Sequence, residues 1–152
     1  MKIYLPIEVF RKLRSYAKGI DYEISGLGKV SIADGNITVE DVRIFKQKVS
    51  GTDTTLDRRA LGKFYDEIIK EEGDLSKWKL WWHSHADMGV FFSSIDESTI
   101  ADFDNETEKD NWLLSLVTNK KGDFKIRLDL FSPIKLTMDN LEYEILYETE
   151  DV

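Results

Sequence analysis

The two histidines of this chain, His83 and His85, stand one residue apart and offer the clearest potential for chemistry. They follow an aromatic and apolar run, residues 78–82, which predicts a buried strand. Side chains of a strand alternate between its faces, so both imidazoles would point the same way, roughly 6.6 Å apart along the backbone. From that separation two imidazoles can bind one zinc ion through Zn–N bonds of about 2.0–2.1 Å.

Asp96 stands where a following helix is expected to begin, and it would supply an oxygen ligand to the same ion. Three protein ligands and a position open to water describe a catalytic metal site rather than a structural one. The alternative interpretation is that His83 and His85 are ordinary strand residues. Two histidines on one face, followed by a serine and an aspartate at helix-start spacing, favour metal binding.

Four residues share a recognisable spacing: His83, His85, Ser93 and Asp96. This pattern of His-x-His, seven residues, then Ser-x-x-Asp resembles the signature of the JAMM metalloproteases, also called the MPN domain family. The residues that flank it, Trp-Trp before His83 and Phe before Ser93, resemble the usual entry and exit of that site. One departure is Ala86, where the family most often has proline, a residue that shapes the turn rather than holds metal.

The resemblance implies roles for two further residues. Zinc would lower the pKa of its bound water towards ~7, and a carboxylate would take the proton from that water and pass it to the leaving amine. Family members place this glutamate on an early strand in a Glu-x-x-Gly setting, which Glu23 matches; Glu40 on the next strand is the alternative. Ser93 resembles the serine whose hydroxyl stabilises the oxyanion, and its alternative role is that of a plain helix N-cap.

Composition limits the other classes of function. The chain has 152 residues, enough for one domain over residues 1–152 that buries roughly 70% of its unfolded surface. It has no cysteine, which excludes disulfides, cysteine nucleophiles and the cysteine-ligated zinc of nucleobase deaminases. A net charge of −8 argues against nucleic acid and anionic membrane as partners. The start lacks a signal peptide and no stretch has transmembrane length, so we expect a cytoplasmic protein.

Periodicity predicts three helices, over residues 6–18, 56–72 and 93–103. The expected buried side of the first is Ile7, Phe10, Leu13 and Ala17, and that of the second is Leu61, Phe64 and Ile68. Alternation predicts strands over residues 22–32, 37–45, 78–82, 111–118 and 124–131, with a hairpin turn at 34–36. The tail, residues 135–147, reads as strand but could be partly helical. Glycines at 26 and 28 would permit close approach of other backbone.

Helices that separate strands and hairpins predict a mixed sheet with helices on both faces. The JAMM fold, similar to that of cytidine deaminases, is such a three-layer αβα sandwich. We therefore expect a compact member, of prokaryotic or phage type, with Zn2+ as cofactor. It would cut a peptide or isopeptide bond after the C-terminal tail of ubiquitin or a ubiquitin-like protein, in the manner of a deubiquitinase. The alternatives are a non-catalytic MPN-type scaffold that binds a protein partner and a zinc hydrolase of small amides.

Overall fold

The computed structural model describes residues 1–45, 58–105 and 111–147 of the chain. Its centre is one mixed sheet of eight strands in the order β7-β6-β5-β4-β2-β3-β1-β8. The strands are β1 (Ile3–Pro6), β2 (Ile24–Ala33), β3 (Asn36–Ile44), β4 (Leu80–Ser84), β5 (Trp112–Thr118), β6 (Phe124–Leu130), β7 (Leu136–Met138) and β8 (Tyr143–Leu146). The helices are α1 (Ile7–Gly19), α2 (Arg58–Glu72) and α3 (Ser94–Asp102).

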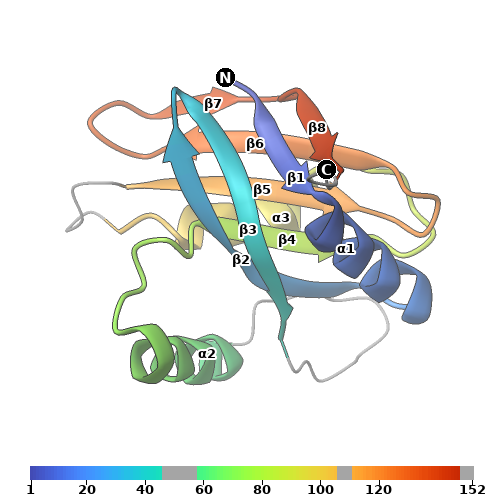
Figure 1. Cartoon of the computed structure of the whole chain (residues 1–152), viewed down its shortest axis with the longest axis horizontal. Helices are drawn as coiled ribbons and strands as arrows, with labels where there is room; N and C mark the ends of the chain where they lie inside the picture. Colours follow the sequence, from blue (N-terminus) through green and yellow to red (C-terminus); the bar gives the residue numbers. More distant parts are fainter. Residues whose placement is uncertain (46–57, 106–110, 148–152) are drawn as a thin grey trace, which may run out of the picture.

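The helices lie on both faces of the sheet. Neighbouring residues of β4 point to opposite faces, and each face has its own core. Val9 of α1 belongs to the core that contains Trp82, whereas Phe64 of α2 and Ile100 of α3 belong to the core that contains Trp81. Figure 1 shows α1 in front of the sheet and α3 behind it. The predicted α/β class, with a mixed sheet between helices, is confirmed.

The sheet is curled, because its two edge strands are close neighbours in the sequence. β7 and β8 are joined by residues 139–142 alone, and such a connection spans at most about 18 Å. A flat sheet of eight strands would be about 34 Å wide. The edges must therefore approach each other, as the upper part of Figure 1 shows. Within the connection, the Leu141 N–H donates to the Ile126 carbonyl at 2.9 Å.

β4 occupies the middle of the sheet and carries the first part of the motif. It pairs antiparallel with β2 and parallel with β5, and all five of its residues are buried. A strand covered on both faces has to be apolar along its whole length, which explains the continuous run that predicted it. The register sets His83 opposite Ser25 on one side and opposite Val117 on the other.

The N-terminus differs from the sequence prediction. Residues 3–6 form β1, which pairs parallel with β3 and β8, and Pro6 is the N-cap of α1 rather than part of its first turn. The buried side of α1 is Val9, Leu13 and Ala17, whereas Ile7 and Phe10 are only half-buried. β1 places Ile3 and Leu5 in the core, and α1 buries the side that carries Val9 in place of the side that carries Phe10.

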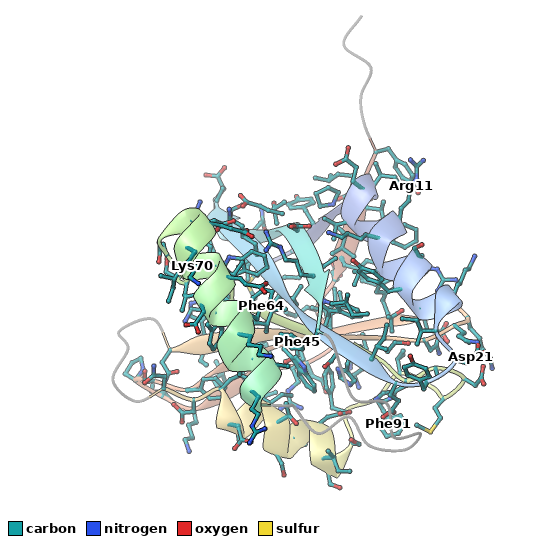
Figure 2. All side chains as sticks on the ribbon, turned by 90° about the horizontal axis from the view of Figure 1, so that it is seen from below. Arg11, Asp21, Phe45, Phe64, Lys70 and Phe91 are labelled. Atoms are coloured by element: carbon teal, nitrogen blue, oxygen red, sulfur yellow. The ribbon has the colours of Figure 1, made fainter. Side chains whose placement is uncertain are left out.

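Most of the other predicted elements are confirmed. The 34–36 hairpin has positive φ at Asp34 and Gly35, as a tight turn between twisted strands requires. The predicted second helix is present as α2, with Phe64 and Ile68 buried; residues 56–57 of that prediction lie outside the described residues. Figure 2 shows Phe64 directed towards Phe45, and their rings meet edge to face at 5.5 Å. The tail forms strands β7 and β8.

The close approach predicted at the β2 glycines is confirmed at Gly26. A Cβ atom there would lie 1.8 Å from the Arg43 carbonyl oxygen and 2.7 Å from Trp82 Nε1. The Trp82 indole crosses Gly26 to donate to that same carbonyl at 3.0 Å. Among the described ranges, no helix is long and apolar enough to cross a membrane.

We predict that Gly26→Ala destabilises the protein by roughly 3 kcal/mol, because the added methyl group would overlap the Arg43 carbonyl and the Trp82 indole, so both have to shift and the hydrogen bond between them breaks. Urea unfolding measures the change. Gly62→Ala is the matched control, since Gly62 lies in α2 with open space around it. That substitution should instead stabilise the helix by about 0.5–1 kcal/mol. Equal unfolding midpoints for the two variants would contradict the packing described here.

Candidate metal centre

The structure brings His83, His85 and Asp96 together. His83 lies on β4, His85 directly follows that strand, and Asp96 lies in the first turn of α3. The two Nε2 atoms are 3.1 Å apart, and each lies 3.1 Å from Asp96 Oδ2. All three side chains are buried, with 0%, 2% and 2% of their surface exposed. The three ligand atoms form a compact triangle that could hold a metal ion.

The predicted alternation of β4 is confirmed. Trp81 shares the face of His83 and stacks on its ring, with centroids 4.3 Å apart. Trp82 points to the opposite core, where it stacks on Tyr16. Ser84 also points away from the histidines, and its Oγ accepts the N–H of Ala86 at 3.2 Å. Ser84 therefore shapes the turn after the strand and is separate from the metal ligands.

Ala86 has a positive φ of 55°. The proline ring holds φ near −65°, so a proline could not adopt the backbone conformation seen here. The turn is fixed by other contacts: the Met88 N–H donates to the His85 carbonyl, and the Lys120 N–H donates to the Ala86 carbonyl. The backbone of this turn therefore requires a residue other than proline at position 86.

Asp96 is oriented by the start of α3. Ser93 is the N-cap: its Oγ accepts the Asp96 N–H at 3.1 Å, while Asp96 Oδ2 accepts the Ser93 N–H at 2.9 Å. This reciprocal pair is a capping box, which satisfies two backbone donors at the helix start. The Ser-x-x-Asp spacing thus aims the carboxylate at the histidines. The predicted helix start is confirmed, together with the N-cap role of Ser93.

α3 is also anchored on the sheet, through the residue after Asp96. Arg127 of β6 donates from Nη1 and Nη2 to Glu97, the latter bond at 2.8 Å, and from Nε to Asp129 at 2.9 Å. The neighbouring carboxylates raise the pKa of Arg127 further, although burial opposes this. Two bidentate ion pairs to one guanidinium fix its orientation, so the first turn of α3 is held in register with β6.

The triangle of ligand atoms favours a cation at its centre. His85 Nδ1 lies 2.9 Å from the Gly89 carbonyl, and a carbonyl can only accept, so this nitrogen carries the proton. In neutral His85 the lone pair of Nε2 then faces the carboxylate oxygen of Asp96. Two acceptors at hydrogen-bond distance repel each other unless a proton or a metal ion lies between them. The edges of 3.1 Å are close to the roughly 3.3 Å between ligands on a tetrahedral ion with bonds of about 2.0 Å.

The electrostatics of the three groups show that the triangle favours a positive charge, either a proton on His85 or a metal ion. Burial lowers the pKa of His83, so the ring is held neutral, as a metal ligand must be. Burial opposes the charged form of His85 as well, but the bonds to Asp96 and Gly89 outweigh it and raise the pKa. Burial likewise opposes ionisation of Asp96, yet its bonds to the two histidines lower its pKa well below the usual range. The carboxylate is therefore ionised.

Glu23 lies beside the centre and Glu40 does not. Glu23 directly precedes β2, and continuing the Ile24–Ser84 pairing by one residue sets it opposite His85. Its negative charge acts to raise the pKa of both histidines, although burial, which lowers the pKa, and the contacts with Asp96, which raise it, have larger effects. Glu40 is exposed on β3, level with the far end of β4, and β2 separates it from the histidines. The structure thus brings only the first of these two carboxylates to the site.

Two features of the site escaped the sequence interpretation. The Gly89 carbonyl, which fixes the His85 tautomer, is a backbone atom whose position depends on the turn and leaves no trace in residue type. His83 Nδ1 is buried without a hydrogen-bond partner among the described residues. Since Nδ1 makes no hydrogen bond there, the ring is held by its stacking on Trp81 and by its Nε2 contacts.

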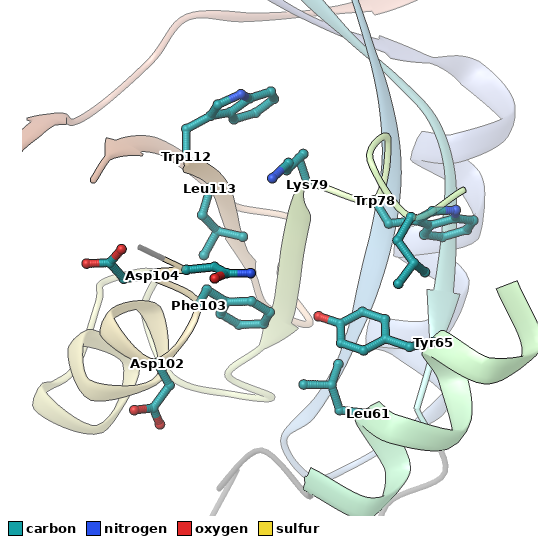
Figure 3. A pocket seen from close by; sticks show the side chains of 11 residues that line it. Leu61, Tyr65, Trp78, Lys79, Asp102, Phe103, Asp104, Trp112 and Leu113 are labelled. Carbon is teal, nitrogen blue, oxygen red and sulfur yellow. The ribbon is translucent and has the colours of Figure 1, made fainter. Parts of the chain in front are cut away.

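A separate pocket lies at the other end of β4. It has a volume of about 430 Å³ and is bounded by α2, the end of α3 and the starts of β4 and β5. Figure 3 shows Tyr65, Phe103 and Trp112 around it, with Lys79 at its edge. Lys79 precedes β4 whereas His85 follows it, so the pocket lies away from the metal centre.

Comparisons with known proteins support the fold alone. No family model and no curated protein sequence matches the chain. Among solved structures, the chain is similar to the solution structure of protein DSY2949 from Desulfitobacterium hafniense. The TM-score is 0.67 at 18% sequence identity, over 97% of this chain and 95% of that one. Similarity of this kind shows a shared architecture, and function has to be argued from the site.

We predict that purified protein holds about one metal ion per chain and that His83→Ala, His85→Ala and Asp96→Ala each lose it, because each removes one of three ligands. Elemental analysis across the first-row metals measures this. Asp102→Ala is the matched control, since Asp102 is the last residue of the helix that carries Asp96 in its first turn; it should retain the metal. A metal-free native protein after growth with added zinc would contradict the assignment.

Proposed function

We propose that this chain is a zinc-dependent metallopeptidase of JAMM type that cuts a peptide or isopeptide bond after the C-terminal tail of ubiquitin or a ubiquitin-like protein. The observation that carries the proposal is the convergence of His83 Nε2, His85 Nε2 and Asp96 Oδ2 at mutual distances of 3.1 Å. The residues of the motif meet as the resemblance requires, although they come from a strand, a turn and a helix.

Zinc fits this set of donors. Two neutral imidazoles and one carboxylate leave a position open, which is the usual composition of a catalytic zinc site. When bound, zinc would act as a Lewis acid on the scissile carbonyl and lower the pKa of a coordinated water. Two histidines and a carboxylate also suit non-haem iron. Iron rather than zinc in the elemental analysis would therefore overturn the proposed chemistry while leaving the ligands in place.

Glu23 is the proposed general base. It shares with Ser25 the face of β2 that meets His83, so alternation turns its carboxylate towards the centre. From there it would accept a proton from the attacking water and deliver it to the leaving amine. Its position before the strand, outside the triangle of ligand atoms, suits a group that moves protons and does not bind metal.

Ser93 is the proposed oxyanion donor. Its Oγ accepts the Asp96 N–H, and this uses a lone pair of the hydroxyl while the O–H can still donate. A hydroxyl fixed at a helix start, next to a metal ligand, is preorganised for negative charge that develops on the carbonyl oxygen. The N-cap role and the oxyanion role are thus compatible in one side chain.

The substrate would reach the centre past an apolar lip, formed by Met88 and Phe91. Both side chains are about half exposed, and the Phe91 ring meets the His85 ring edge to face at 4.8 Å. Figure 2 shows Phe91 near the molecular surface. Apolar side chains beside a buried polar centre suit an extended peptide, which they would help to shield from water.

We predict that Glu23→Gln folds and retains zinc but loses turnover by roughly 10²–10⁴-fold, because glutamine keeps the shape of the side chain and cannot take a proton at neutral pH. Fusions of ubiquitin-like proteins to a C-terminal extension, followed by mass spectrometry, supply the assay. Glu40→Gln is the control and should cleave normally. Loss of zinc from Glu23→Gln would make Glu23 a ligand instead. Zinc-loaded wild type that cleaves no fusion would favour the non-catalytic scaffold.

We predict that Ser93→Ala still binds zinc and costs roughly 10²–10³ in turnover, through loss of the oxyanion donor. It should also lower stability by about 1 kcal/mol, through loss of the N-cap. Ser93→Gly separates the two effects, since glycine at an N-cap costs only about a few tenths of a kcal/mol but has no hydroxyl to donate. Normal turnover in both variants would reduce Ser93 to its role as a cap.

A further inference from the structure

Asn119 connects two segments that are far apart in the sequence. It directly follows β5, is fully buried, and its Nδ2 donates to the Met88 carbonyl at 3.0 Å. Met88 belongs to the turn between His85 and Gly89. Buried polar atoms need hydrogen-bond partners. One partner of this amide is the turn that follows His85, so Asn119 constrains that turn as well as filling space in the core.

The orientation of this amide is fixed by Asp123. Asn119 Oδ1 accepts the Asp123 N–H at 3.1 Å, so the opposite end of the amide is the donor. Nδ2 then donates to Asp123 Oδ2 at 3.0 Å as well as to Met88. Arg14 of α1 adds a further constraint, since its Nη1 donates to the Asn119 carbonyl at 3.0 Å. The side chain and the backbone of Asn119 are both held in place.

The same segment holds the backbone on both sides of His85. The His85 N–H donates to the Thr118 carbonyl at 2.9 Å, and the Lys120 N–H donates to the Ala86 carbonyl at 2.8 Å. Asn119 supplies the third contact, at Met88. Met88 is followed directly by Gly89, whose carbonyl oxygen lies 2.9 Å from His85 Nδ1. Fixing Met88 therefore fixes the group that sets the tautomer of His85.

We propose that Asn119 is a positioning residue for the metal centre. By holding Met88, it keeps the Gly89 carbonyl against His85 Nδ1, so Nε2 presents its lone pair to the ion. Outer partners that orient a ligating histidine typically change metal affinity by roughly 10–100-fold when removed. The inference rests on the proposed function only through the metal site, since it concerns metal affinity and not cleavage.

The test compares two buried asparagines at opposite ends of β5. Asn119→Ala should weaken zinc binding by roughly 10–100-fold, measured by competition with a chromophoric chelator. Asn111→Ala is the matched control: Asn111 is also buried, precedes β5 and donates to Asp104, far from the histidines. It should lower the melting temperature and leave the zinc affinity unchanged. The double variant Asn119→Asp/Asp123→Asn keeps one carboxylate and one amide in the pair and an oxygen at residue 119, but lacks the donor to Met88; it should weaken zinc binding like the alanine variant.

The outcomes separate this inference from the proposed function. Wild-type zinc affinity in the Asn119 variants, or equal weakening in Asn111→Ala, would overturn the positioning role and leave the proposed peptidase standing. If Asn119→Ala does not fold, the double variant Asn119→Asp/Asp123→Asn decides the matter with the same measurement. Wild-type protein that binds no zinc would overturn both. Weak zinc binding in the Asn119 variants together with an unaffected control supports the positioning role, whether or not a cleaved substrate has been found.

Discussion

The site depends on the repulsion between acceptor atoms that the fold forces together. Asp96 Oδ2 and His85 Nε2 lie 3.1 Å apart, with the ring proton of His85 committed to Gly89 on its far side. Backbone groups hold both partners: the Ser93 N–H holds the carboxylate and the Gly89 carbonyl holds the ring. A side chain free to move would relieve the conflict by rotating away. Here the capping box and the turn prevent it, so the three groups are arranged in advance to share a proton or to hold a metal ion.

The sheet makes this preparation possible. β4 lies between two paired strands and is covered on both faces. Because a packed core leaves its side chains little room to move, the position of His83 is fixed. α3 is tied to β6 through Arg127, so the element that carries Asp96 cannot slide relative to the strand that carries His83. The chemistry of the centre therefore rests on rigid elements, while the loop residues around it contribute one backbone carbonyl and an apolar rim.

The sequence predicted the features that are encoded locally. The alternation of β4, the start of α3 at Ser93 and the close approach of backbone at Gly26 each follow from residue type and spacing within a few positions. The features that sequence reasoning missed depend on distant partners. β1 is short and pairs only with strands far along the chain, so Ile3 and Leu5 gave too brief a pattern to recognise. Asn119 reads as an ordinary turn residue, because nothing near it in the sequence reveals its contact with Met88.

The curl of the sheet has a consequence for association with other chains. An exposed edge strand offers unpaired N–H and C=O groups on which a foreign strand can add. In this fold the two edge strands, β7 and β8, both lie within residues 136–146, and they are three and four residues long. Neither edge therefore presents a long template for strand addition. The stretch that closes the curl also limits edge-to-edge aggregation at both borders of the sheet.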